Sequence, residues 1–212
     1  MKIDVKGSII PTDDAWIYDL FGIQNTSPDK VAQALTDANG EDVDIDINSG
    51  GGDVFAGSEI YSAIRAYPGK VNIHVVGIAA SAASVIACAA HSDIAPTAQM
   101  MVHNVSTYAD GNYHDMDKMS DTLKQADRAI AAAYVEKSGM SEQDALDLMD
   151  DETWLTAQDA VDYGLIDEIA PSKNAQPGEA TRLTASVGGM LPPSVIEKMQ
   201  NRRQELLDYF TK

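Results

Sequence analysis

The sequence predicts an α/β fold built from repeated strand, turn and helix units. Three stretches that begin near Ile3, Val43 and Val71 alternate apolar with polar residues, as strands with one buried face do. After the second and third stretches come runs of small residues and then apolar residues at helical spacing. Strands that alternate with helices in this way form a largely parallel sheet.

The first half of the chain is predicted to contain three such units. Ser27 followed by Pro28 marks a helix start, because serine caps free N–H groups and proline suits the first helical position. Asn39-Gly40 and Pro68-Gly69 are typical of the turns that end helices. The expected elements are strands at residues 3–7, 43–47 and 71–75 and helices at residues 28–39, 54–66 and 85–90.

The second half is predicted to be dominated by one long amphipathic helix. Apolar residues fall at positions 116, 119, 123, 126, 130 and 133, so they form one stripe that needs a partner surface. Ser141 with Asp144, and Thr156 with Asp159, are capping boxes that start two further helices. Short strands are expected at residues 94–95, 100–102 and 165–169.

The composition changes beyond Pro171, where a polar stretch follows the last predicted strand. We therefore expect a compact domain at residues 1–171, a flexible linker at 172–193, and a C-terminal helical tail at 194–212 that Ser194 caps.

Charge and composition exclude several classes of function. The chain has 15 basic and 33 acidic side chains and a formal net charge of −18, so its surface should repel nucleic acids and anionic membranes. No targeting segment is expected from residues 1–10, and the sequence has no run of about 18 apolar residues. The single cysteine, Cys88, lies in an apolar run and is predicted to be a core residue of a cytoplasmic protein.

Ser81 is the candidate nucleophile. It lies between a predicted strand and a predicted helix, and only alanines flank it on both sides. A sharp turn of this kind exposes a hydroxyl where helix N–H groups can stabilise an oxyanion, as the different motif G-x-S-x-G does. Taken alone, the segment fits a small packing residue equally well.

His103 is the candidate general base that a serine hydroxyl needs. It ends the short strand predicted at residues 100–102, and a Ser-Lys pair would need a distant lysine because residues 71–117 contain no lysine or arginine. The other histidines are predicted to be surface or structural residues: His74, His91 and His114.

The run from Asn48 to Asp53 is the third candidate piece of a site. Its glycines let backbone amides approach a substrate closely, although the run also fits a flexible turn. Because it lacks the lysine and hydroxyl of a phosphate-binding loop, nucleotide binding is the weaker interpretation. No metal or cofactor is expected.

Four motifs in a fixed order carry a resemblance to a known family. They are Ile47-Asn48-Ser49-Gly50-Gly51-Gly52, Gly77-Ile78-Ala79-Ala80-Ser81, Met101-Val102-His103, and the stretch from Trp154-Leu155-Thr156-Ala157 to Tyr163-Gly164-Leu165-Ile166-Asp167. Over residues 3–170 the chain resembles the proteolytic subunit of the Clp protease. The resemblance implies a crotonase/Clp-type superhelix of strand, strand, helix units with a protruding handle helix. It also implies homo-oligomeric rings and the cleavage of polypeptide substrates in an enclosed chamber.

The resemblance also implies roles for individual residues. Ser81 matches the family nucleophile and His103 its base, and the N–H groups of Gly52 and Ala82 match the oxyanion hole. The family aspartate stands where this chain has Glu152, and the adjacent Asp151 is left open as the third member of the triad. The helix at residues 116–133 matches the handle that joins two rings in the relatives, with an ordinary core helix as the alternative.

Two departures from the family pattern narrow the expected role. Relatives that work with an ATP-driven unfoldase carry a segment ahead of the first strand, whereas here that strand begins almost at Met1, and a linker follows residue 171. Both features resemble the Clp-type head maturation proteases of phages and prophages, which cut scaffold and capsid proteins. We therefore expect such a serine endopeptidase in the host cytoplasm, with an AAA+ unfoldase a less expected partner.

Three alternatives remain. They are a proteolytic subunit of an ATP-dependent Clp protease, a crotonase-type acyl-CoA enzyme, which would leave Ser81 and His103 without a role, and a non-catalytic ring subunit.

Overall fold

The structure, a computed structural model, describes residues 1–171. The linker predicted at residues 172–193 and the helical tail predicted at 194–212 lie outside the described residues.

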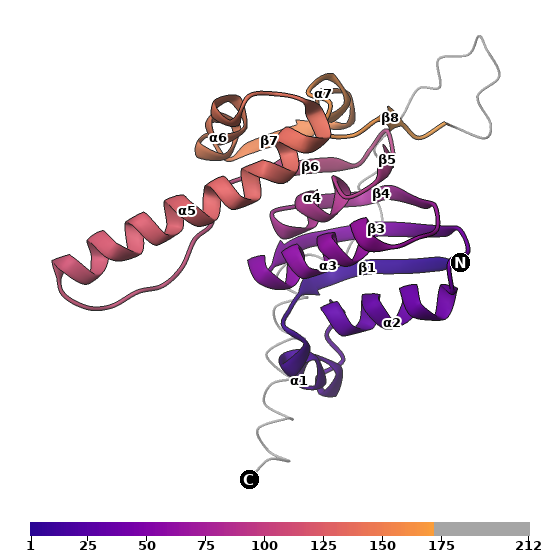
Figure 1. The fold of residues 1–212 in the computed structure, drawn as a ribbon, viewed down its shortest axis with the longest axis horizontal. Helices are drawn as coiled ribbons and strands as arrows, with labels where there is room; N and C mark the ends of the chain where they lie inside the picture. The colour runs from indigo at the N-terminus through magenta and orange to yellow at the C-terminus, as the bar shows by residue number, and fades with distance from the viewer. Residues whose placement is uncertain (172–212) are drawn as a thin grey trace, which may run out of the picture. The chain divides into compact units, whose positions relative to one another are not determined.

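An eight-stranded sheet forms the centre of the described chain (Figure 1). Its parallel strands run in the order β2 (Asn25–Thr26), β1 (Lys2–Ile9), β3 (Val43–Gly52), β4 (Val71–Ala80), β5 (His91–Ile94) and β8 (Glu168–Ile169). Strand β6 (Gln99–Val102) pairs in parallel with the end of β4, and β7 (Thr153–Thr156) pairs antiparallel with β6. The order explains why residues distant in sequence meet at the carboxyl end of β4.

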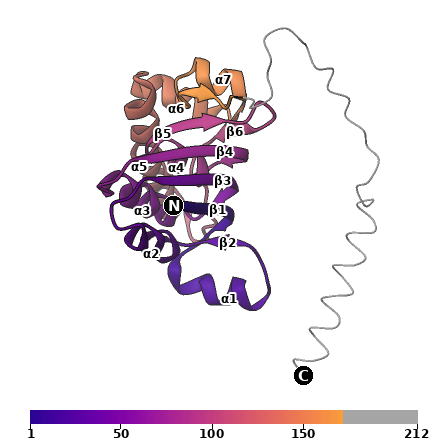
Figure 2. The ribbon, with the colours of Figure 1, turned by 90° about the vertical axis from the view of Figure 1, so that its right-hand side faces the viewer.

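Helices α2 (Pro28–Ala38) and α3 (Val54–Ala66) lie side by side against one face of the sheet (Figures 1 and 2). Helix α4 (Ala82–Ala87) follows β4 and packs on α3 and β3. The 26-residue α5 (Tyr113–Ser138) extends away from the body at its N-terminal end (Figure 1). The remaining helices are the 3-10 turn η1 (Thr12–Asp14), α1 (Ala15–Leu20), α6 (Glu142–Asp150) and α7 (Ala157–Asp162).

Aliphatic side chains between the sheet and these helices form the core. Ile45 and Ile47 of β3 and Ile60 of α3 are fully buried, and Val31 of α2 is nearly so. Each such side chain stabilises the fold by about 1.5 to 3 kcal/mol relative to exposure to water. No helix in the described residues is both long enough and apolar enough to cross a membrane.

Several predicted elements are confirmed. Helix α3 covers residues 54–66 as predicted, and α2 begins after Ser27 and ends at Asn39, whose φ of 49° is left-handed. The capping boxes at Ser141 and Thr156 are both formed. The long helix begins three residues earlier than predicted because Asn112 and Asp115 form another capping box.

The strands extend further than predicted. Strand β1 continues past Gly7, where a φ of 72° and a register shift allow the chain to bend without ending the strand. Strand β3 continues to Gly52, so the glycine run is paired backbone rather than a free turn. The strand predicted at residues 165–169 shortens to β8, and the helix predicted at 85–90 begins earlier, at Ala82.

Candidate active site

Ser81 occupies a strained turn between β4 and α4. Its φ of 54° and ψ of −125° are rare for a residue with a Cβ. Its N–H donates to the carbonyl of Met101 at 2.9 Å, which joins the turn to β6. Its own carbonyl accepts bonds from the N–H of Ser84 at 2.9 Å and from the Ser84 hydroxyl at 2.6 Å. These three bonds fix the backbone from which the hydroxyl projects.

The structure brings Ser81 and His103 together. Ser81 Oγ lies 2.8 Å from His103 Nε2, which is hydrogen-bond distance. His103 follows β6, and β6 pairs with β4 so that Met101 lies opposite Ala80. The pairing of β4 with β6 therefore places both side chains. Ser81 directly follows Ala80, and His103 lies two residues after Met101.

Gly52 and Ala82 line the same cavity as Ser81 and His103, a hollow of about 70 Å³. Ala82 is the first residue of α4, so its N–H has no acceptor within the helix. At Gly52 a Cβ would lie 2.0 Å from the carbonyl oxygen of Ile9, so only glycine fits. Both predicted oxyanion-hole residues thus border the candidate nucleophile.

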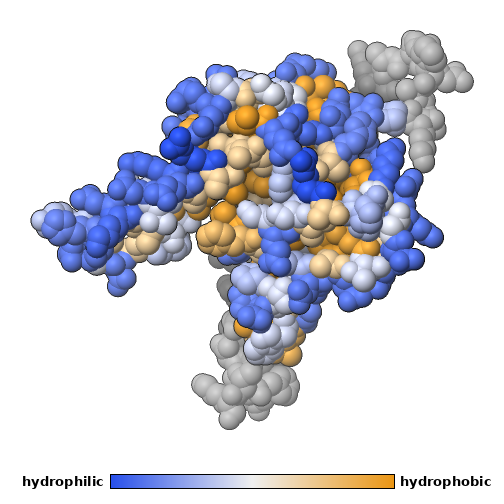
Figure 3. Space-filling model, in the orientation of Figure 1, coloured by the Kyte–Doolittle hydropathy of each residue, from blue (hydrophilic) through white to orange (hydrophobic). Residues whose placement is uncertain are grey.

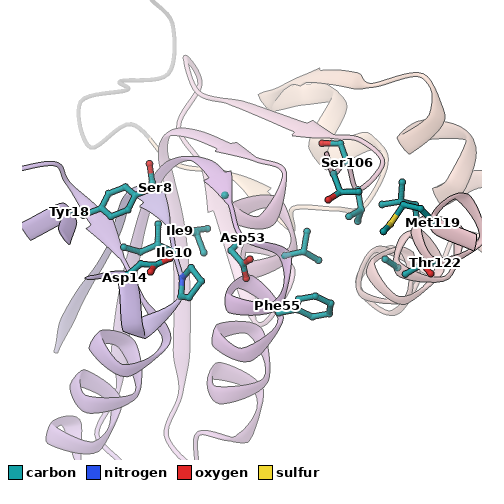
Figure 4. A pocket seen from close by; sticks show the side chains of 17 residues that line it. Ser8, Ile9, Ile10, Asp14, Tyr18, Asp53, Phe55, Ser106, Met119 and Thr122 are labelled. Carbon is teal, nitrogen blue, oxygen red and sulfur yellow. The ribbon is translucent and has the colours of Figure 1, made fainter. Parts of the chain in front are cut away.

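A larger groove of about 570 Å³ shares Gly52, Val54, Val105 and Ser106 with this cavity. The end of β1 and helix α1 form one wall of this groove, and α5 forms the other. Figure 4 shows Phe55 and Asp53 on the sheet side and Met119 and Thr122 on the α5 side. The lining is mainly apolar. The site therefore opens into a channel wide enough for side chains beyond the reacting bond.

Neither Glu152 nor Asp151 makes a hydrogen bond or ion pair with His103 in the described residues. Both are exposed, Glu152 in a turn with a φ of 48° and Asp151 at the end of α6. Within residues 1–171, no carboxylate makes a hydrogen bond or ion pair with the His103 ring. The assignment of Glu152 or Asp151 as third member of the triad stays a prediction.

Asp127 is a further residue near the site that was not predicted from the sequence. It is buried in α5, and its Oδ1 accepts the N–H of Val105, two residues after His103, at 2.7 Å. Burial raises the pKa of Asp127, the Val105 N–H lowers it, the charge of Asp150 raises it, and the charge of His103 lowers it; the net shift is upward. The sequence does indicate that Asp127 is buried. It lies four residues after Leu123 and three before Ile130, so it falls on the apolar stripe of the helix.

The other predicted structural residues have ordinary partners. His74 Nδ1 lies 2.7 Å from Asp93, and His91 Nδ1 lies 3.2 Å from Asp167. His114 stacks against Tyr113. Cys88 is buried, and burial raises its pKa to about 12, so it is an inert core thiol.

The fold and the site define an α/β protein in which a serine hydroxyl meets a histidine at the edge of a largely parallel sheet. The family model described as "Clp protease" matches residues 23–173, and the chain belongs to the Clp protease family. The described fold also resembles a mutant of ClpP1 from Listeria monocytogenes, with a TM-score of 0.67 and 22% identity, covering 82% of this chain and 92% of that chain. The predicted Clp-type α/β fold is therefore confirmed.

Curated relatives point to the same family. The chain is 31% identical over 134 residues to "ATP-dependent Clp protease proteolytic subunit 1" of Streptomyces avermitilis, covering 62% of each chain. It is 34% identical over 133 residues to the subunit of the same description in Chlamydia abortus, covering 60% of this chain and 69% of the relative. The chain spans less than two thirds of the length of the Streptomyces relative. These matches favour the Clp proteolytic subunit over the phage head maturation protease predicted from the sequence.

Proposed function

We propose that this chain is a Clp-type serine peptidase in which Ser81 is the nucleophile and His103 the general base. The observation that carries the proposal is the 2.8 Å distance between Ser81 Oγ and His103 Nε2. The distance lies within the reach that proton transfer from a serine requires. Family membership supports the same chemistry.

In the proposed reaction, Ser81 Oγ attacks the carbonyl carbon of a peptide bond as its proton passes to His103 Nε2. The N–H groups of Gly52 and Ala82 stabilise the resulting oxyanion. His103 then gives the proton to the departing amine, which leaves an acyl group on Ser81. Water attacks this ester, loses a proton to His103, and releases the second product as the Ser81 hydroxyl is restored.

Polypeptides are the proposed substrates. The groove of about 570 Å³ continues from the cavity at Ser81 and presents mainly apolar residues, so it suits an extended segment with apolar side chains. A crotonase-type acyl-CoA reaction would use the oxyanion hole but would give the Ser81–His103 pair no role.

Two biological roles remain distinguishable. The relatives named above favour a proteolytic subunit that works with an ATP-driven unfoldase, and the resemblance to phage head maturation proteases favours cleavage of scaffold and capsid proteins. We place the first role ahead. ATP-dependent degradation of a folded substrate, seen only when a partner ATPase is added, would support it. ATP-independent cleavage of a scaffold protein would support the second.

The test of the peptidase proposal is intact-mass measurement after exposure to a fluorophosphonate probe. Wild-type protein should gain one adduct per chain, whereas Ser81→Ala should gain none and His103→Ala should react far more slowly. Ser62→Ala is the matched control, because Ser62 lies on the exposed side of α3 and bonds only the Ser58 carbonyl. A folded wild-type protein that gains no adduct would contradict the proposal and favour an acyl-CoA enzyme or a non-catalytic ring subunit.

A further inference from the structure

Two carboxylates hold the segment that follows His103. From α5, Asp127 Oδ1 accepts the N–H of Val105 at 2.7 Å. From the end of α6, Asp150 Oδ1 accepts the side-chain amide of Asn104 at 2.6 Å. Both residues immediately after His103 are therefore tied to acidic groups, and these come from two different helices.

Asp127 is an unusual residue for its place. Among residues 1–171 it is the one charged side chain that is buried, with 8% of its surface exposed, beside Ile130 and Ala131 on the inner face of α5. An ionised carboxylate in such a place costs folding free energy unless a charge or hydrogen bond stabilises it. Residues that break the packing pattern in this way concentrate at functional sites.

The charged groups around His103 can be assigned to their elements. The turn between β4 and α4 contributes the Ser81 hydroxyl, and α5 contributes Asp127, whose charge interacts with the ring. Helix α6 contributes Asp150, which accepts the side-chain amide of Asn104 and whose charge also acts on Asp127. Glu152 follows α6 and makes no hydrogen bond or ion pair with the ring in the described residues. Asp127 is thus the buried carboxylate that acts on His103.

We infer that Asp127 is a positioning residue for His103. Its carboxylate holds the His103 segment through the Val105 N–H and supplies the negative charge that stabilises the imidazolium formed when Ser81 gives up its proton. Asp127 itself stays ionised throughout, and the proton moves only between Ser81, His103 and the leaving group. The inference rests on the proposed peptidase function, and it assigns to Asp127 the electrostatic role that the family pattern gives to the position of Glu152.

Asp127→Asn is the decisive variant, because its amide oxygen can still accept the Val105 N–H while the charge is lost. We expect kcat/KM for a peptide substrate to fall about 10- to 100-fold, mainly through kcat. Without the carboxylate the imidazolium is less favoured, so the acid limb of the pH–rate profile should move to lower pH. Asp127→Glu keeps the charge and should keep the limb in its wild-type position, even if its rate is reduced.

The matched control is Asp147→Asn. It removes the same charge from an exposed position on α6, where the Asp147 carboxylate accepts the Gln143 side-chain amide, so rate and pH profile should stay as in wild type. Glu152→Gln and Asp151→Asn test the competing assignment. A shifted acid limb in either of these two variants, with an unshifted limb in Asp127→Asn, would overturn the inference.

A second measurement separates this inference from the proposed function. NMR titration of labelled histidine follows the His103 ring directly and needs no activity. If the ring of Asp127→Asn titrates at lower pH than that of wild type, the electrostatic link stands, even in a protein that cleaves nothing. If the two titrations coincide, the inference fails, whether or not the protein is a peptidase.

Discussion

Ser81 adopts a conformation that is costly in isolation. A non-glycine residue at positive φ costs about 1 to 3 kcal/mol. Three hydrogen bonds to its backbone, from or to Met101 and Ser84, offset this cost at about 1 kcal/mol each. The conformational cost and the hydrogen-bond stabilisation of the turn are similar in size. Small substitutions beneath the turn should therefore displace the Ser81 hydroxyl before they unfold the protein.

Gly51 lies directly beneath this turn. It has a φ of 92°, and a Cβ there would lie 2.6 Å from the Ala80 carbonyl oxygen and 2.7 Å from Ser81 Cβ. We predict that Gly51→Ala lowers the free energy of unfolding by about 1 to 3 kcal/mol and the fluorophosphonate labelling rate at least 10-fold. Denaturant unfolding and intact-mass time courses check both effects.

Gly50→Ala is the neighbouring control for stability. A Cβ at Gly50 meets nothing within 4 Å, and its φ is not in the left-handed region. Its free energy of unfolding should stay within about 0.5 kcal/mol of wild type. Equal destabilisation by the two substitutions would show that the close contacts at Gly51 do not decide the conformation of the turn.

Tyr134 supports the same turn from α5. Its hydroxyl lies 2.7 Å from Ser84 Oγ, and because Ser84 donates to the Ser81 carbonyl, Tyr134 must donate to Ser84. Tyr134→Phe should therefore cost about 1 kcal/mol of stability and slow labelling of Ser81 severalfold. Tyr163→Phe, at a largely exposed position, should change neither. Unchanged labelling in Tyr134→Phe would exclude a link from α5 to the nucleophile.

The site could be predicted in part because its two central residues carry local signals. Ser81 stands among alanines at a strand end, and His103 ends another apolar strand. Their contact depends on the pairing of β4 with β6, which no local pattern specifies. Asp127 could not be assigned, because a single acidic residue on an apolar stripe has no partner in the sequence. Its partner, the Val105 N–H, exists only in the folded chain.

At the scale of elements, Lys137 joins α5 to the far edge of the sheet. Its side chain is 9% exposed, and its ammonium group bonds the Ala90 carbonyl at 2.8 Å and forms an ion pair with Asp167. Lys137→Met keeps the apolar stem and leaves Asp167 without this partner. We predict that the free energy of unfolding falls by about 1 to 3 kcal/mol. The decrease is smaller than for a fully buried pair because Asp167 is 38% exposed and water screens it. Denaturant unfolding measures the loss.

The pH dependence of this loss follows from Asp167. Burial raises the pKa of Asp167, but the Lys137 and Ser92 hydrogen bonds and nearby positive charges outweigh burial and lower it. A carboxyl whose folded pKa is lowered adds stability above its unfolded pKa of about 3.9, and that stability is lost as pH falls through the folded pKa. The difference between wild type and Lys137→Met should therefore shrink in acid. Lys124→Met removes an exposed ion pair and should stay within about 0.5 kcal/mol of wild type throughout.

Helices with regular apolar periodicity or capping residues could be predicted from the sequence. Short strands that form only because a neighbouring strand pairs with them could not. Helix α3 has apolar residues at helical spacing and a clear end at Pro68-Gly69. Helix α1 has six residues, and its apolar side chains, such as Trp16 and Leu20, are largely exposed, so no buried face repeats. Strand β7 is four residues long and exists because β6 offers it a partner. Short strands depend on tertiary contacts that the sequence does not state locally.

At the scale of the whole molecule, two opposing forces bear on the assembly into rings that the family resemblance implies. The net charge of −18 makes copies repel one another. The outer part of the α5 stripe, Met116, Met119 and Leu123, is exposed or half-buried in the single chain. Figure 3 shows apolar residues gathered where α5 meets the body, with a mostly hydrophilic surface on the protruding part. An apolar strip inside such a surface is suited to docking against a second copy.

We predict that the stripe on α5 holds copies together. The double variant Met116→Gln, Met119→Gln should have a lower mass in light scattering than wild type, whose mass should be a multiple of 22.7 kDa. Ser120→Ala with Gln125→Ala, at exposed positions of the same helix, leaves the net charge unchanged and should retain the wild-type mass. Added salt screens the repulsion and should favour assembly of wild type more than of the stripe variant, which lacks the apolar contact. A stripe variant with wild-type mass at every salt concentration would assign the handle a role other than joining copies.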